Sequence, residues 1–180
     1  MGQRFERLND HHRAFIERQK LFFVATAARE GHVNVSPKGL DSLRVLDDRT
    51  VLWLNGTGSG NETAAHLLGA PRMTLMFCAF EGNPLILRLY GEAAAFHPRD
   101  PEWPGYIGLF PTLGSARQIF KLDVSLVQTS CGFGVPLFDF REDRGLMHAW
   151  AEKKGPDGVR AYWEEKNQVG LDGQPTGIFE

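Results

Sequence analysis

The chain has little cysteine, no long apolar run and no block of basic residues, and each lack argues against a class of protein. Cys78 and Cys131 are the only cysteines, so we expect reduced thiols in the core of a cytoplasmic protein, not a disulfide or a metal pair. The apolar runs have the length of strands, far below the ~20 residues of a membrane-spanning helix. The 20 basic and 22 acidic residues are dispersed and leave a net charge of −2, which makes nucleic acid and membranes poor partners.

Motifs for metal and nucleotide binding are also missing. No His-Glu-x-x-His or Cys-x-x-Cys pattern occurs, so no metal site is expected. Gly56, Gly58 and Gly60 precede a predicted helix, but their spacing is not that of a dinucleotide-binding loop, and no Lys-Ser or Lys-Thr follows them as in a P-loop. No residue stands out as a catalytic acid, base or nucleophile, so the catalytic residues are unknown from the sequence.

What the sequence does contain is a series of short strand patterns separated by turns. Its 180 residues, 42% of them hydrophobic, suit one domain over residues 1–180 that ends in a helix and tail from about residue 143. Apolar or alternating segments predict strands at 21–28, 32–36, 50–55, 73–80, 85–96 and 116–129, with helices within 5–20, 62–68 and 143–166, the last of them broken at Gly155-Pro156. Consecutive strands indicate a mainly β protein, an antiparallel barrel with helical appendages.

A glycine-rich loop between a strand and a short helix is the most informative stretch. The strand at 50–55 leads into Gly56-Thr-Gly-Ser-Gly-Asn-Glu-Thr63, and the helix begins near Glu62. The N–H groups of such a loop and of the helix start, together with the helix dipole, favour an anion. Ser59, Asn61 and Thr63 add side-chain donors. The alternative is a flexible turn in which Ser59 or Asn61 simply caps the helix.

Lys38 is predicted to lie in the same region as this loop. It follows a strand whose alternation puts Asn34 and Ser36 on one face and two valines on the other. Pro37 is expected to break the pairing, which presents Lys38 at a strand end. Antiparallel neighbours then bring Lys38 close to the glycine-rich loop.

Arg88 is the second cation that we consider for this site. It interrupts an otherwise apolar strand, so it needs a carboxylate such as Glu92 or an anionic ligand. We therefore predict an anion site built from Ser36, Lys38, the loop at 56–63 and Arg88. Such a site suits a phosphate attached to a flat heterocycle.

Several segments in order resemble a known family. They are Val33-Asn-Val-Ser-Pro-Lys-Gly39, the strand with Trp53, Gly58-Ser-Gly-Asn-Glu-Thr63 with His66-Leu67, Arg72-Met-Thr-Leu-Met-Phe-Cys-Ala-Phe80 and Leu87-Arg-Leu-Tyr-Gly91. The combination closely resembles the pyridoxamine 5′-phosphate oxidase-like family of FMN-binding split-barrel proteins. The resemblance covers roughly residues 22–96, and the tail at 166–173 is similar to the family's ending.

The resemblance implies a six-stranded antiparallel split barrel that forms a homodimer with FMN at the subunit interface. It implies that the tail around Asn167, or Trp150, reaches the partner's flavin. Deazaflavin F420 is the alternative cofactor, since F420 binders share the fold. The residues that the resemblance assigns to the cofactor are Ser36, Pro37, Lys38, Gly39, Leu54, Asn55, Ser59, Gly60, Asn61, Thr63 and Arg88.

Two departures from the family separate this chain from true pyridoxamine phosphate oxidases. Those enzymes carry arginines near the C-terminus that grip the substrate phosphate, whereas this chain has only Arg160 after Arg144. Ser36-Pro37 also replaces the aliphatic residues that precede the lysine. We therefore expect a flavin-dependent oxidoreductase of unknown substrate. The alternatives are an F420-dependent reductase, or a flavin store or haem-handling protein with His97 or His148 as axial ligand.

Overall fold

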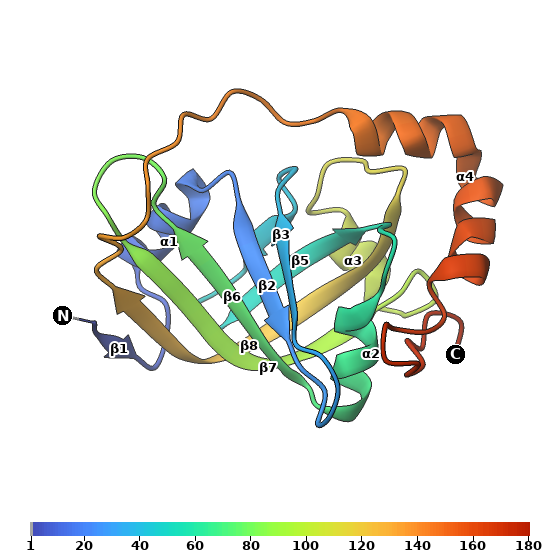
Figure 1. The fold of residues 1–180 in the computed structure, drawn as a ribbon, viewed down its shortest axis with the longest axis horizontal. Helices are drawn as coiled ribbons and strands as arrows, with labels where there is room; N and C mark the ends of the chain where they lie inside the picture. The colour runs from blue at the N-terminus through green and yellow to red at the C-terminus, as the bar shows by residue number, and fades with distance from the viewer. Residues whose placement is uncertain (1) are drawn as a thin grey trace.

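The structure, a computed structural model, describes residues 2–180 and is organised around one curled antiparallel sheet with helices at its rim (Figure 1). The strand order is β3-β2-β6-β7-β8-β5-β4, and β1 pairs with β8. The strands are β1 (Arg4–Phe5), β2 (Phe22–Thr26), β3 (Asn34–Lys38), β4 (Leu43–Val45), β5 (Thr50–Gly56), β6 (Arg72–Cys78), β7 (Ile86–Phe96) and β8 (Ala116–Ser130). The helices are α1 (Asp10–Arg18), α2 (Glu62–Gly69), α3 (Trp103–Ile107) and α4 (Leu146–Lys166).

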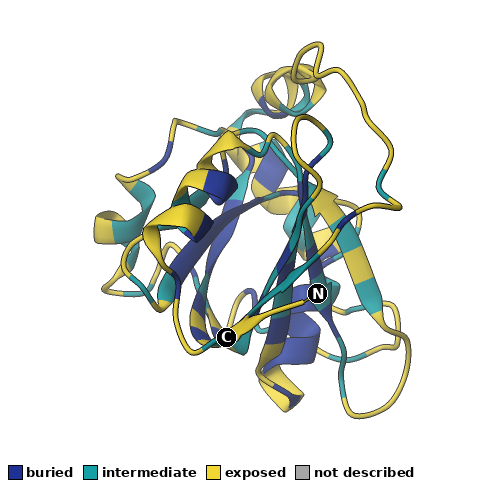
Figure 2. Cartoon of the chain, turned by 90° about the vertical axis from the view of Figure 1, so that its left-hand side faces the viewer, coloured by how far each residue is buried: buried dark blue, intermediate teal, exposed yellow. Residues whose placement is uncertain are grey.

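The curl of the sheet encloses the main core. β7 pairs with β8 along its whole length, and the register shifts between Tyr90 and Gly91, a bulge that bends and twists the sheet. A Cβ on Gly91 would overlap the carbonyl of Asp123 on β8, so the close approach of the two backbones requires glycine here. Inside the curl, Trp53 stacks on Phe120 with ring centroids 4.9 Å apart. Figure 2 shows these buried strands surrounded by more exposed helices and loops.

The expected antiparallel split barrel is confirmed, although the sheet has eight strands and not six. The two additional strands are short, since β1 has 2 residues and β4 has 3. Six longer strands form the body of the sheet. β3 and β4 end the strand order without pairing to each other, so the barrel is split between them.

The prediction that Pro37 ends its strand is wrong. β3 continues to Lys38, and Pro37 pairs in register with Phe23 of β2. The strand tolerates proline because β3 lies at the edge of the sheet, where a residue without an N–H group loses no ladder bond. The expectation of two core thiols is wrong for Cys131, which is exposed, whereas Cys78 is buried; both are free.

The last part of the chain passes over the top of the sheet and continues down its right side in the view of Figure 1. Residues 131–145 cross as an irregular segment, which the Phe138 N–H anchors by donating to the Phe80 carbonyl at 2.9 Å. α4 bends at Gly155, whose φ is 66°, in agreement with the predicted break at 155–156. The tail then returns to the β2–β3 turn, where Asp172 pairs with His32 at 2.6 Å. No helix of the described residues is both long and apolar enough to cross a membrane.

Candidate functional site

The loop after β5 and the strand β3 line one cavity, which we call the anion cavity. It has a volume of about 190 Å³ and lies where the end of β5, the glycine-rich loop and the start of α2 face β3. Its polar lining is rich in hydroxyls, amides and cations. The lining residues are Asn34, Ser36, Lys38, Trp53, Asn55, Gly56, Gly58, Ser59, Gly60, Asn61, Glu62, Thr63 and Arg117.

Alternation along β3 directs its polar side chains into this cavity. Asn34, Ser36 and Lys38 are all partly buried and line it, whereas Val35 and Pro37 between them are exposed. The ammonium of Lys38 lies 5.1 Å from the ring centroid of Trp53. Burial, followed by repulsion from Arg117, lowers the pKa of Lys38 to about 8. The lysine is therefore a half-desolvated cation, which binding of an anion would stabilise.

The N-terminus of α2 opens into the same cavity. Asn61 occupies the N-cap position but makes no capping hydrogen bond. Its Oδ1 instead accepts from Nε2 of Gln118 at 2.6 Å, and its Nδ2 donates to the Asn167 carbonyl at 3.4 Å. Since the usual cap is turned away, the first N–H groups of α2 are left to an external acceptor. This arrangement favours the anion site over the simple capped turn.

Arg117 at the start of β8 is the second cation of the cavity, and it organises the loop. Its side chain is 3% exposed and donates to Asn55 Oδ1 at 2.8 and 3.2 Å, to the Gly60 carbonyl at 3.0 Å and to Asn167 Oδ1 at 2.7 Å. Burial lowers the pKa of Arg117 to about 10, so it stays charged at neutral pH. Asn167 in turn donates to the Gly58 carbonyl at 3.1 Å. These bonds fix both ends of the loop.

Among the residues that the structure describes, Glu62 is the one carboxylate that lines the cavity. Its charge raises the pKa values of both Lys38 and Arg117, in opposition to the larger effect of burial. Two cations and one carboxylate leave a net positive cavity with hydroxyl and N–H donors around it. This donor set fits a phosphate monoester. The volume is below the range of sites for whole drug-sized ligands, so the anion cavity suits the phosphate end of a larger molecule.

The structure brings together seven of the eleven predicted cofactor residues around the anion cavity and leaves four outside its lining. The seven are Ser36, Lys38, Asn55, Ser59, Gly60, Asn61 and Thr63. Among the other four, Leu54 packs in a second core cluster with Leu52 and Ile119, and Pro37 is exposed on the outer side of β3. Gly39 lines a neighbouring cavity. The role of all eleven in cofactor binding stays a prediction.

Arg88 lies on the face of the sheet opposite to the core. It pairs in register with Met76 of β6 and Gln128 of β8, between the fully buried Leu87 and Leu89. Its Nη1 donates to Ser130 Oγ at 3.1 Å, and Glu92 is not its partner among the described hydrogen bonds and ion pairs. The side chain therefore sits on the outer face and does not join Lys38.

The sequence reasoning missed Arg117. Like Arg88, Arg117 is a charged residue on a largely apolar strand, close to Ile119 and Phe120, and such a residue needs a partner. The sequence therefore marks both arginines equally. The register of β5 with β8, which places Asn55 opposite Gln118, shows that Arg117 is the one beside the glycine-rich loop.

Sequence comparison relates most of this chain to a known family. Residues 8–131 match the family described as Pyridoxamine 5'-phosphate oxidase. Over 144 residues the chain is 44% identical to the Pyridoxamine 5'-phosphate oxidase family protein ustO of Aspergillus flavus, an alignment that spans 77% of this chain and 58% of that protein. The chain thus covers little more than half the length of this curated relative.

Solved structures share the fold at low sequence identity. HupZ of Group A Streptococcus matches with a TM-score of 0.52 at 20% identity, over 66% of this chain and 91% of that one. A putative pyridoxamine 5'-phosphate oxidase from Lactobacillus delbrueckii matches with a TM-score of 0.53 at 17% identity, over 68% and 94%. These likenesses speak to the fold alone. The match over residues 8–131 and the identity to the Aspergillus flavus relative show that the chain belongs to the pyridoxamine 5'-phosphate oxidase family.

Proposed function

We propose that this protein binds FMN, with the phosphate in the anion cavity, and works as a flavin-dependent oxidoreductase. The observation that carries the proposal is the convergence of Lys38, Arg117 and the uncapped start of α2 on one cavity. Membership of the pyridoxamine 5'-phosphate oxidase family supports a flavin as the molecule that carries the phosphate.

The residues of this chain have distinct tasks in that proposal. Lys38 supplies a charge that gains stability when a phosphate is bound, because burial has depressed its pKa to about 8. Arg117 holds the loop in shape through its bonds to Asn55 and Gly60. Ser36, Ser59 and Thr63 add hydroxyl donors around the cavity. When bound, the isoalloxazine ring supplies the hydride or electron transfer.

Oxidation of pyridoxamine 5'-phosphate itself is not part of the proposal. Arg160 lies on α4 with its guanidinium exposed and paired with Glu164 at 3.2 Å, and the described tail after it has no further arginine. A second phosphate would therefore find no arginine clamp near the C-terminus.

The experiment is a side-by-side titration of the purified full chain with FMN and with F420, followed by absorbance. We expect stoichiometric uptake of FMN. We also expect the FMN-loaded protein to oxidise NADH or NADPH when an electron acceptor is added. Preferential uptake of F420 would show that the cofactor is F420 and not FMN, and uptake of neither would overturn the proposal. Uptake of FMN without oxidation of any donor would contradict the oxidoreductase activity and support flavin binding alone.

We also propose that the protein is a homodimer through the outer face of β2 and β3. Val33 and Val35 are 70% and 60% exposed, and the outer face near them has a depression of about 550 Å³ that Ala25, Ala27 and Tyr90 help to line. Exposed apolar side chains on an edge strand and directly before it are a usual protein contact. Light scattering should give twice the chain mass for the wild type and the single mass for Val35→Glu, and a monomeric wild type would refute the proposal.

A further inference from the structure

A second cavity adjoins the anion cavity on the far side of the glycine-rich loop, and we call it the aromatic cavity. Its volume is about 520 Å³, within the range of small-molecule sites. Gly58 and Ser59 line both cavities, so a molecule in the aromatic cavity lies next to the ligand of the loop. The rest of its wall comes from the β3–β4 turn, from residues 143–144 and from α4.

The bend in α4 creates the aromatic part of this wall. Trp150 and Tyr162 are 12 positions apart, which would separate them by about 18 Å along a straight helix. They nevertheless meet edge to face, with ring centroids 5.2 Å apart. The left-handed backbone at Gly155, with φ of 66°, turns the second half of the helix and brings the two rings together. Both rings line the cavity and are partly exposed.

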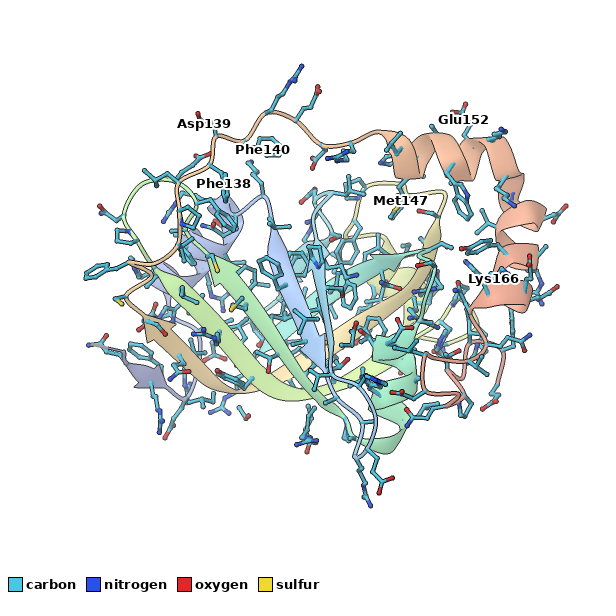
Figure 3. The ribbon with its side chains drawn as sticks, in the orientation of Figure 1. Phe138, Asp139, Phe140, Met147, Glu152 and Lys166 are labelled. Atoms are coloured by element: carbon cyan, nitrogen blue, oxygen red, sulfur yellow. The ribbon has the colours of Figure 1, made fainter. Side chains whose placement is uncertain are left out.

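α4 is held firmly against the loop, so these rings belong to a defined wall. Met147 points from α4 toward the sheet whereas Glu152 points away (Figure 3), and a Cβ on Gly56 would lie 2.6 Å from Sδ of Met147. Ala151 of the same helix is buried. Nε1 of Trp163 donates to Thr57 Oγ1 at 2.7 Å. Contacts from both halves of the helix therefore fix it to residues 56–57.

The opposite wall contains a strained residue. Leu40 has a φ of 62°, a conformation that costs a bulky side chain on the order of 1 kcal/mol or more and that asparagine or glycine adopts easily. Arg44 holds the turn by donating to both carboxylate oxygens of Asp41 at 2.7 and 3.0 Å. Ser42 Oγ donates to the Gly39 carbonyl at 2.6 Å. The strained position places an apolar side chain in the cavity wall.

We propose that the aromatic cavity is the substrate compartment of this protein and that it takes a neutral molecule with a planar aromatic ring. The inference rests on the proposed function, because it is the neighbouring flavin that would make the occupant a substrate. Indole, phenol, thioether and leucine side chains favour a flat apolar ring. The charged residues of the lining, Asp143 and Arg144, are both exposed, so the part of the chain that the structure describes places no buried cation there for a phosphorylated substrate.

The test measures calorimetric binding of 2-naphthol, a neutral bicyclic probe, to the full chain with and without FMN. Trp150→Ala should weaken 2-naphthol binding about tenfold, and Trp150→Phe, which keeps a ring, should retain most of it. Phe133→Ala is the matched control, since Phe133 is 81% exposed outside the cavity, and it should bind like the wild type. FMN affinity should be the same in Phe133→Ala and the wild type, and thermal unfolding curves establish that each variant is folded.

The outcomes separate this inference from the proposed function. No binding of 2-naphthol to the wild type, or equal binding by Trp150→Ala and Phe133→Ala, would overturn the aromatic cavity as a ligand site even if FMN binds. Ring-dependent binding without any FMN uptake would support the cavity and refute the flavin. Should Trp150→Ala fail to fold, loss of 2-naphthol binding in a folded Tyr162→Ala supports the inference, and unchanged binding there contradicts it.

Discussion

Replacing Lys38 by methionine should stabilise the free protein while it removes the anion site. The ammonium is half-buried, and burial with repulsion from Arg117 lowers the pKa of Lys38 from 10.5 to about 8. A drop of this size means that the charged lysine costs the folded state about 3 kcal/mol at about pH 7 compared with a neutral one. Loss of the contact with Trp53, 5.1 Å from the ammonium, offsets about 1 kcal/mol. We expect a net gain of about 2 kcal/mol in the free energy of unfolding of Lys38→Met.

The sign follows from proton linkage. The folded pKa of Lys38 is below the unfolded one, so between the two values the unfolded chain binds more protons and stability rises with pH. The buried charge of Lys38 therefore destabilises the folded state by its full amount when the pH is well below its pKa of about 8. This destabilisation decreases as the pH rises above that value. The advantage of Lys38→Met should shrink by about 2 kcal/mol between about pH 7 and about pH 9.5.

Urea unfolding of both proteins at the two pH values measures this difference, and other titrating groups cancel between them. Addition of inorganic phosphate should raise the stability of the wild type and leave that of Lys38→Met unchanged, because ligand binding to the folded state alone stabilises it. A Lys38→Met protein that is less stable at neutral pH, or a stability difference that does not change with pH, would refute the reasoning.

Three further changes test separate parts of the account. Glu62→Gln removes the only carboxylate of the anion cavity among the described residues and should tighten FMN binding about five- to tenfold in a fluorescence titration, so weaker binding would contradict its placement. Asn167→Ala removes one of the acceptors of Arg117 and the donor to Gly58 and should cost about 1–3 kcal/mol by chemical unfolding, whereas an unchanged value would show the tail to be dispensable. Gly91→Ala places a Cβ against the Asp123 carbonyl and should cost about 3 kcal/mol or prevent folding; a fully stable variant would refute the bulge.

The arrangement of strands and the meeting of Lys38 with the glycine-rich loop could be predicted from the sequence. Strand patterns joined by turns leave few topologies, and the alternation of β3 already separates Ser36 and Lys38 from the valines. Pro37 was interpreted wrongly because whether a strand is an edge strand depends on which neighbours pair with it, and that is a property of the whole sheet.

Which arginine serves the site could not be predicted for the same reason. Arg88 and Arg117 both interrupt apolar strands, and a shift of one residue in register exchanges the two faces of a strand. The pairing of Leu87 and Leu89 into the core sets Arg88 on the outer face, while Arg117 lies at the end of β8 beside Asn55. The meeting of Trp150 with Tyr162 depends likewise on the bend of α4. The sequence indicated a break there but not its direction.

The claim that Lys38 and the glycine-rich loop together hold a phosphate is tested most directly by comparing FMN with riboflavin, which lacks only the phosphate. Titration calorimetry on the wild type and on Lys38→Met gives all four affinities. The account predicts that the wild type binds FMN at least about tenfold more tightly than riboflavin and that Lys38→Met loses most of this difference. Equal affinities of the wild type for FMN and riboflavin, or an undiminished preference in Lys38→Met, would contradict it.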